Sequence, residues 1–231
     1  MDFHNISFDD FFNIELALEN LPFILGGVPI MLFITIVSMG FGLILGLILA
    51  LWRGSKRKYL RWPARVYISF MRGTPMLVFL FILYFGLPMT GLKLSALTAA
   101  CLGFGLNSAA YIAEINRSAL NSIDHGQWES AKALNLSYLQ TMQHVIFPQA
   151  VRIAVPPLTS VVMDILKATS LAAVITVPEL FQKTQIVAGR TYDSMTMYIL
   201  LAIIYWLFCI VLGFMQSYLE KRYSLYVTNE H

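Results

Sequence analysis

Long apolar runs without a charged residue alternate with short polar segments along this chain. Four such runs cover residues 21–52, 73–92, 94–113 and 194–219. Each reaches the ~20 residues that a helix needs to cross ~30 Å of hydrocarbon. A fifth run, 150–176, is interrupted by three charged residues. The pattern predicts an all-α integral membrane protein with five transmembrane helices, over about 21–52, 62–88, 94–119, 149–176 and 193–220.

Composition supports this class of protein. Hydrophobic residues make up 58% of the chain and its mean hydropathy is +0.67, whereas apolar residues make up about half of a soluble domain. The chain begins with a polar, acidic segment, and the apolar run after it is too long for a cleavable signal. Ser7 and Asp10 have the spacing of a capping box, so we predict a short helix over 1–20 lying on the membrane surface. Residues 21–231 then form the transmembrane domain.

The basic residues indicate how the chain is oriented in the membrane. Six of them gather between the first two apolar runs: Arg53, Lys56, Arg57, Lys58, Arg61 and Arg65. Because Lys and Arg concentrate in cytoplasmic loops, this loop is predicted to be cytoplasmic. Five spans then place the N-terminus outside and the C-terminus inside. The net charge of the whole chain is +3, and the placement of the basic residues matters more than this total. A basic loop beside a span indicates an orientation signal or a contact with anionic lipid, in preference to nucleic-acid binding.

Small residues recur inside two of the predicted spans. Gly42 and Gly46 form a GxxxG pair in the first span, and Gly103 and Gly105 lie in the third. Small residues let transmembrane helices approach closely. We predict that these glycines serve packing within the chain, in preference to a contact between two copies.

The polar segment over 122–148 is longer than a simple connection requires. Asp124 is placed to cap a helix beginning near His125, with Gln127 completing a capping box. Asn135 tolerates the left-handed conformation that ends a helix. A second capping box, Ser137 with Gln140, opens another helix, and Pro148 is expected to end it. The segment therefore predicts two short helices below the membrane, which either cover the bundle as an ordered loop or bind a partner.

This segment resembles the EAA loop of the membrane subunits of ABC importers. In the string ESAKALNLS…IFPQA, residues 129–131 (Glu, Ser, Ala) match the EAA core, and Pro148 matches the terminal Pro of that family. Asn135 stands where the family usually has Gly. Three more segments are similar to the family: SFMRGTPMLVFLFILYFGLP (69–88), NSAAYIAEINRSALNSIDHGQWESA (107–131) and LKATSLAAVITVPEL (166–180). The resemblance covers nearly the whole chain and implies the type I ABC importer fold, with polar amino acids as the cargo.

The resemblance also implies partners. The chain has no GxxxxGK[ST] phosphate loop, so we expect no catalytic residue, metal or cofactor in it, and ATP and Mg on two copies of a separate ATPase. The loop is expected to be a short cytoplasmic coupling helix that contacts that ATPase through Gln127, Trp128, Glu129, Ser130, Ala131, Leu134 and Asn135. Further expected partners are an extracytoplasmic solute-binding protein and a second permease subunit, either identical or a close paralogue. The location is the cytoplasmic membrane of a prokaryote.

Charged residues inside a span are costly, and they are therefore functional candidates. Asp164 and Lys167 lie three residues apart in the fourth span, followed by Thr169 and Ser170. Both signs of charge suit a zwitterionic amino acid, so these four residues are the predicted substrate site, with an intrahelical ion pair as the alternative. Glu114 and Arg117, near the inner end of the third span, form a predicted gate or structural pair.

Two questions stay open at this level. The sequence favours cystine as the substrate, with basic amino acids or glutamine as alternatives, on the family resemblance alone. An ion-coupled secondary carrier or channel that acts without an ATPase would also explain a charge inside a span. That class of protein gives the polar segment 122–148 no role.

Overall fold

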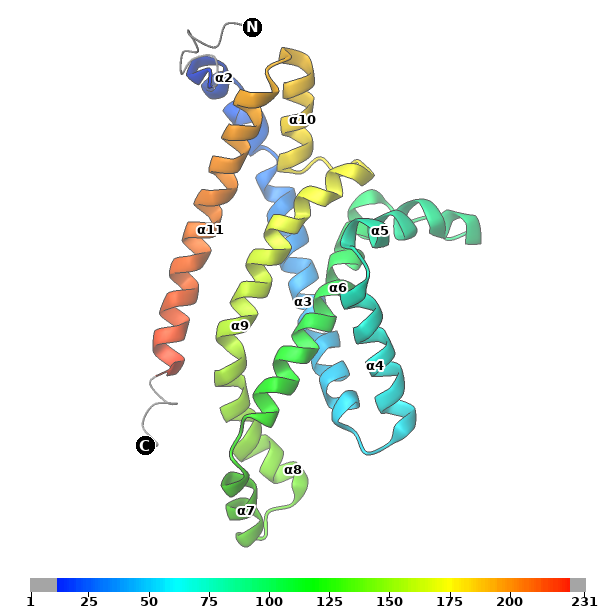
Figure 1. Ribbon diagram of the computed structural model, residues 1–231, viewed down its shortest axis with the longest axis vertical. Helices are drawn as coiled ribbons and strands as arrows, with labels where there is room; N and C mark the ends of the chain where they lie inside the picture. The colour runs from blue at the N-terminus through cyan, green and yellow to red at the C-terminus, as the bar shows by residue number, and fades with distance from the viewer. Residues whose placement is uncertain (1–11, 225–231) are drawn as a thin grey trace, which may run out of the picture.

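The computed structural model describes residues 12–224, and every regular element within that range is a helix (Figure 1). Four long helical segments are apolar enough to cross a membrane. Three of them are the single helices α3 (Val28–Gly54), α6 (Ala96–Asn121) and α11 (Ser194–Ser224). The fourth, Tyr138–Ile175, is built around α9 (Phe147–Ala168). In chain order, α3, α6, the segment Tyr138–Ile175 and α11 correspond to the first, third, fourth and fifth predicted spans.

Helices α3 and α6 pack against each other through small residues. A Cβ added to Gly46 would lie 2.7 Å from Ile112 Cγ2 and 3.0 Å from the carbonyl oxygen of Ala109. A Cβ on Gly42 would collide with Ser108 Oγ. Ile112 and Ala109 are fully buried at this contact. The glycines therefore act in packing within the chain, as the sequence predicted.

The second predicted span, 62–88, is not one straight helix. Helix α4 (Lys58–Gly73) is followed by a bend of 106° and then by a short helical segment over 76–90. This segment consists of α5 (Met76–Phe81), a π turn η2 (Ile82–Gly86) and a 3-10 turn η3 (Leu87–Thr90). At the bend, Thr74 and Pro75 have extended backbone dihedrals. For Thr74 this agrees with the general rule that the helical region is disfavoured for a residue before proline. The described residues thus contain five spans only when this bent pair is counted as one.

The fourth span continues through the proline that was expected to end a helix. Helix α8 (Tyr138–Thr141) passes through a π-helical turn η4 (Met142–Ile146) directly into α9, so the prediction for Pro148 was wrong. The Phe147 N–H bonds the carbonyl of Met142, five residues back, and this wider turn accommodates a residue that has no N–H. After α9, the 3-10 helix η5 (Thr169–Ile175) ends at Thr176, which has a φ of 65°.

Two short helices cover one end of the bundle. Helix α2 (Ile14–Leu25) packs Ala17 and Ile24 against α10 (Leu180–Thr191) and α11. The Arg190 guanidinium donates to Asn20 Oδ1 at 2.6 Å. Asn13 caps α2, and the predicted Ser7–Asp10 capping box lies outside the described residues. Helix α10 was not anticipated from the sequence.

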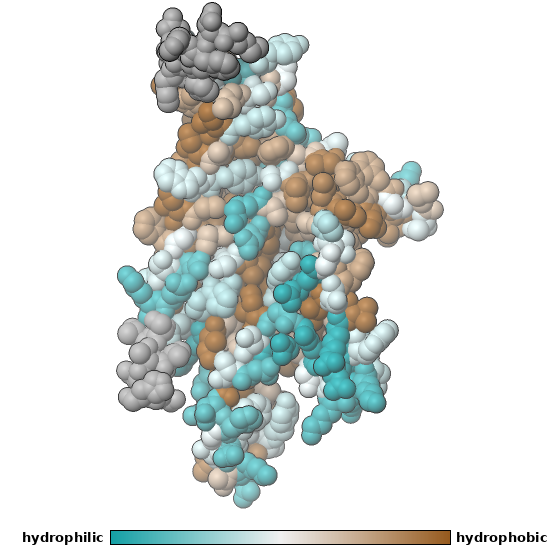
Figure 2. All heavy atoms as spheres, viewed as in Figure 1, coloured by the Kyte–Doolittle hydropathy of each residue, from teal (hydrophilic) through white to brown (hydrophobic). Residues whose placement is uncertain are grey.

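The surface divides according to these elements. On the face shown in Figure 2, hydrophilic residues gather over α4 and around the short helices below it, and hydrophobic residues cover α5. Large apolar side chains are also exposed along the long helices, for example Ile36, Ile44, Trp206 and Phe214. Exposed apolar stripes of this length on spanning helices face lipid or another subunit.

Candidate functional site

The polar segment forms a knob that extends beyond the spanning helices (Figure 1). It consists of α7 (His125–Ala133), a tight turn and α8. Asp124 Oδ1 accepts a hydrogen bond from the Gly126 N–H at 2.6 Å. Asn135 has a φ of 55°, and Ser137 and Gln140 form the complete second capping box. These three local predictions are confirmed.

The first capping box is not completed by Gln127. The Gln127 side-chain oxygen accepts instead from Gln149 Nε2 at 3.1 Å. Gln149 in turn also donates to the carbonyl of Val145. Gln127 therefore joins α7 to the start of the fourth span, because a partner on the neighbouring helix takes the place of the local backbone N–H.

The apolar residues among the predicted ATPase contacts are divided between the interior and the surface. Ala131 is 2% exposed and Leu134 is 75% exposed. Trp128 is half-buried and stacks on Tyr138, with ring centroids 6.0 Å apart. Tyr138 and Leu139 are themselves 71% and 62% exposed. Apolar contact with a partner is therefore available from Leu134, Tyr138 and Leu139, and not from Ala131.

We use the name knob surface for six of the exposed residues of the knob: Glu129, Ser130, Leu134, Asn135, Tyr138 and Leu139. Sequence reasoning missed the last two. The signal that could have found them is their position directly after the Ser137 cap, where an exposed first turn carries large apolar side chains. The knob surface includes residues from both short helices, which are joined by the turn at Asn135.

A cavity of about 510 Å³ opens between α4, α6 and α9. Its polar lining includes Arg72, Asn107, Tyr111 and Asp164, and its apolar lining includes Met76 and Phe104. The Arg72 guanidinium lies over the Tyr111 ring, 5.5 Å from the centroid. Asn107 is fixed by its hydrogen bond to the carbonyl of Met71, at 2.8 Å. A concave site with apolar walls and a few placed polar groups has the form of a small-molecule site.

The four predicted substrate residues do not meet at this cavity. Asp164 lines it, and Lys167 Nζ lies 3.0 Å from Asp164 Oδ1. Lys167 and Ser170 line a separate hollow beside α11. Thr169 is fully buried and donates to the carbonyl of Leu166 at 2.7 Å. At about 100° per residue, Thr169 lies roughly 140° around the helix from Asp164, so the two side chains would not share a face even in a regular α-helix. The helix changes from α to 3-10 at Thr169.

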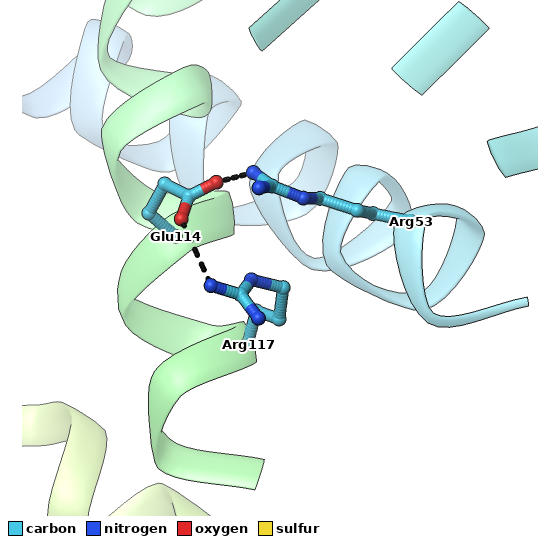
Figure 3. Close-up of polar contacts among 3 residues, drawn as sticks. All are labelled: Arg53, Glu114 and Arg117. Atoms are coloured by element: carbon cyan, nitrogen blue, oxygen red, sulfur yellow. Dashed lines mark hydrogen bonds and ion pairs between the residues drawn. The ribbon is translucent and has the colours of Figure 1, made fainter. Parts of the chain in front are cut away.

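Glu114 lies at the centre of a three-residue ion cluster (Figure 3). One carboxylate oxygen of Glu114 contacts Arg53 at the end of α3, and the other lies 3.4 Å from Arg117 Nη2. The predicted pair Glu114–Arg117 is present, and Arg53 is a third member that the sequence did not reveal. Because both carboxylate oxygens are engaged, Glu114 joins α3 to α6 instead of offering a free charge to the cavity that it also lines.

Comparison with known proteins gives one family. Residues 42–225 match the family described as binding-protein-dependent transport system inner membrane component. The chain is 55% identical over 224 residues to the probable amino-acid ABC transporter permease protein YckA of Bacillus subtilis (strain 168), covering 97% of this chain and 99% of that protein. It is 41% identical over 207 residues to the L-cystine transport system permease protein TcyB of the same organism, covering 89% and 88% of the two chains.

Solved structures show the same fold. The crystal structure of an amino acid ABC transporter with histidines contains a chain that is 31% identical and superimposes with a TM-score of 0.86, covering 94% of this chain and 99% of that one. An inward-facing structure of the MetNI methionine ABC transporter contains a chain with a TM-score of 0.69 at 21% identity, covering 87% and 98% of the two chains. The second likeness concerns the fold alone.

Proposed function

Since the chain belongs to the family of binding-protein-dependent transport system inner membrane components, we propose that it carries a polar L-amino acid across the cytoplasmic membrane with work supplied by a separate ATPase. It is a permease of the amino-acid ABC importer type, an integral membrane protein with several apolar helices. The proposal concerns the substrate, the partners and the residues that act on them.

One feature of the fold carries the proposal: a single helical segment bears both the knob surface and the cavity. Tyr138 and Leu139 stand at the beginning of the continuous segment Tyr138–Ile175, and Asp164 stands near its other end. At 1.5 Å per residue, the two sites are roughly 40 Å apart along it. A force applied to the knob therefore reaches the cavity through unbroken helix, without passing through a loop.

We assign the knob surface to docking on the ATPase. Its apolar side chains supply buried contact, and Glu129 supplies a charged one. Two ATPase copies, which bind ATP and Mg, would draw two knobs together as they close. The spans would then exchange between inward-facing and outward-facing arrangements, and nucleotide binding would favour one of them through its contacts with the knobs.

A second permease subunit and an external binding protein complete the proposed complex. Asp164 has a side chain that is 73% exposed in the single chain, and an ionised group inside a span requires a polar surrounding. A second copy or a close paralogue facing this side would enclose the cavity. The binding protein would deliver the amino acid at the opposite end from the knob, where α2 and α10 lie (Figure 1).

The cavity suits a zwitterion. Asp164 is available to the ammonium group of the substrate, Arg72 to its carboxylate, and Asn107 to either as a hydrogen-bonding group. Lys167 holds the Asp164 carboxylate when the site is empty. The names of the relatives include L-cystine, glutamine and arginine transport. We favour cystine, with glutamine and basic amino acids as the alternatives that the experiment must separate.

The test is substrate-stimulated ATP hydrolysis by the reconstituted complex of permease, ATPase and binding protein. Cystine, glutamine, arginine and other amino acids are each added with the matching binding protein. Asp164→Asn should reduce stimulation by about tenfold or more, since it removes a charge that is hydrogen-bonded to the substrate. Glu220→Gln, which neutralises an exposed carboxylate near the end of α11, is the matched control and should have no effect. Stimulation that survives in Asp164→Asn would remove Asp164 from the substrate site.

A further inference from the structure

Three arginines surround a second hollow next to the cavity, which we call the arginine groove. It is lined by Arg53 from the end of α3, Arg65, Ser69 and Arg72 from α4, and Tyr111 from α6. Among the described residues that line it, every charged side chain is an arginine. Arg53 is close enough to experience the like charges of Arg65, Arg72 and Arg117. Arginines gathered in this way favour an anion, and carboxylates in particular, because the guanidinium offers two parallel donors.

The arginine groove and the lipid-facing surface of α4 lie on different faces of this helix. Lys58, Arg61, Arg65, Ser69 and Arg72 recur every three or four residues and therefore share one face. Exposed apolar residues recur in the same way one position further on: Tyr59, Trp62, Val66 and Phe70. At 3.6 residues per turn the two stripes are about 100° apart. The apolar stripe is suited to contact with lipid. The arginine stripe lies on a different face of α4 and is suited to a polar environment.

The arginine stripe borders the cavity. The groove and the cavity share two lining residues, Arg72 and Tyr111. Glu114, which lines the cavity close by, is already paired with Arg53 and Arg117 and offsets the charge of Arg53. Among the described residues no carboxylate forms an ion pair with Arg65 or Arg72, so these two arginines supply the positive charge of the groove. A positively charged path thus begins at Arg72 and continues along α4, by way of Arg65, toward the predicted cytoplasmic end.

We infer that the arginine groove is a second carboxylate subsite, which receives the anionic end of the amino acid from Arg72 on its way to the cytoplasm. This inference rests on the proposed function, because it takes the cavity as the substrate site. The step is a transfer between ionic contacts: the carboxylate leaves Arg72 as it gains Arg65, so it is never far from a cation. Successive weak sites of one sign permit both entry and release.

The first test measures the groove without using transport. Arg65→Cys is made in a background with Cys101 and Cys209 replaced by Ala, and the nucleotide-free complex is treated with anionic sulfonatoethyl methanethiosulfonate or with its cationic trimethylammonium counterpart. Arg53 and Arg72 remain in this variant. The anionic reagent should therefore react with the introduced thiol faster than the cationic one does, by a factor on the order of ten that falls as salt is added. Asn121→Cys, exposed at the end of α6, is the aqueous control and should show a much smaller preference.

The second test measures uptake by proteoliposomes. Arg65→Gln should reduce the maximal rate several-fold while the binding of amino acid by the external protein is unchanged, and Arg65→Lys should restore part of the rate. Arg222→Gln removes the same charge at the exposed end of α11, away from the groove, and should leave uptake unchanged. Loss of uptake in every form, wild type included, would instead count against the proposed function, and the thiol-modification measurement would still report on the groove.

Four results would overturn the inference. Equal rates for the two reagents in Arg65→Cys would mean that the groove has no preference for anions. Failure of both reagents in that variant, as expected for Tyr59→Cys on the apolar stripe, would mean that Arg65 faces lipid. Protection of the introduced thiol in phosphatidylglycerol nanodiscs but not in phosphatidylcholine nanodiscs would assign the groove to a lipid headgroup. Protection by inorganic phosphate alone would assign the groove to a free anion.

Discussion

Leu134 provides the most direct measure of what the knob surface contributes to docking. Its side chain is 75% exposed in the single chain. Complete burial of a leucine side chain contributes roughly 1.5–3 kcal/mol, so burial of the exposed three-quarters against an ATPase is worth about 1–2 kcal/mol. Because 1.4 kcal/mol corresponds to a factor of ten, Leu134→Ala should weaken ATPase binding about 5- to 30-fold.

The assay is the affinity of the purified ATPase for the permease held in nanodiscs, measured by titration. Leu92→Ala is the matched control, since Leu92 is 55% exposed and follows η3, on the predicted outer side. Leu134→Ala should leave the apparent melting temperature of the permease itself unchanged, because a mutation of an exposed side chain shifts stability by no more than about 0.5 kcal/mol. Equal affinities of the two variants would refute the docking role of Leu134.

Three further predictions concern packing, the turn of the knob and its charge. Gly46→Ala should lower the apparent melting temperature relative to Gly40→Ala, since a Cβ at Gly46 meets Ile112 and one at Gly40 meets nothing within 4 Å, a difference of about 1–3 kcal/mol. Asn135→Val should destabilise the permease by about 1–2 kcal/mol in chemical denaturation, and Asn135→Gly should not, because the position is left-handed. Glu129→Lys should lower co-purification of the ATPase while membrane insertion, measured by membrane fractionation, stays normal. Unchanged co-purification would exclude Glu129 from docking.

The elements that could be predicted from sequence are those fixed by local chemistry. Uncharged runs defined the spans because a helix in lipid must satisfy its own backbone. Asp124, Asn135 and Ser137 defined the knob because each acts on backbone groups within three residues. The glycines of α3 were interpretable because close helix approach requires small residues.

The parts that were missed depend on contacts between distant segments. Gln127 bonds to Gln149 on the neighbouring helix, and Arg53 reaches Glu114 from another span, so neither could be deduced from local spacing. The cavity joins Arg72 to Asp164, which are far apart in the chain.

Changes of helix type within the spans were missed for a related reason. After Ala168 the fourth span changes from an α-helix to a 3-10 helix over Thr169–Ile175. The π turn before Pro148 lets the helix continue at a position where a proline usually ends it. Periodicity assumes one helix type throughout, and both changes break that assumption.

Uptake of a labelled amino acid by proteoliposomes measures the central claim most directly. Vesicles containing the permease alone, or the permease with its ATPase and binding protein, are supplied with ATP or with a proton or sodium gradient. Uptake should occur only when the ATPase and ATP are both present, and an ATPase unable to hydrolyse ATP should abolish it. Uptake by the permease alone under an ion gradient would contradict the account, because the chain would then be a carrier that does not need the knob.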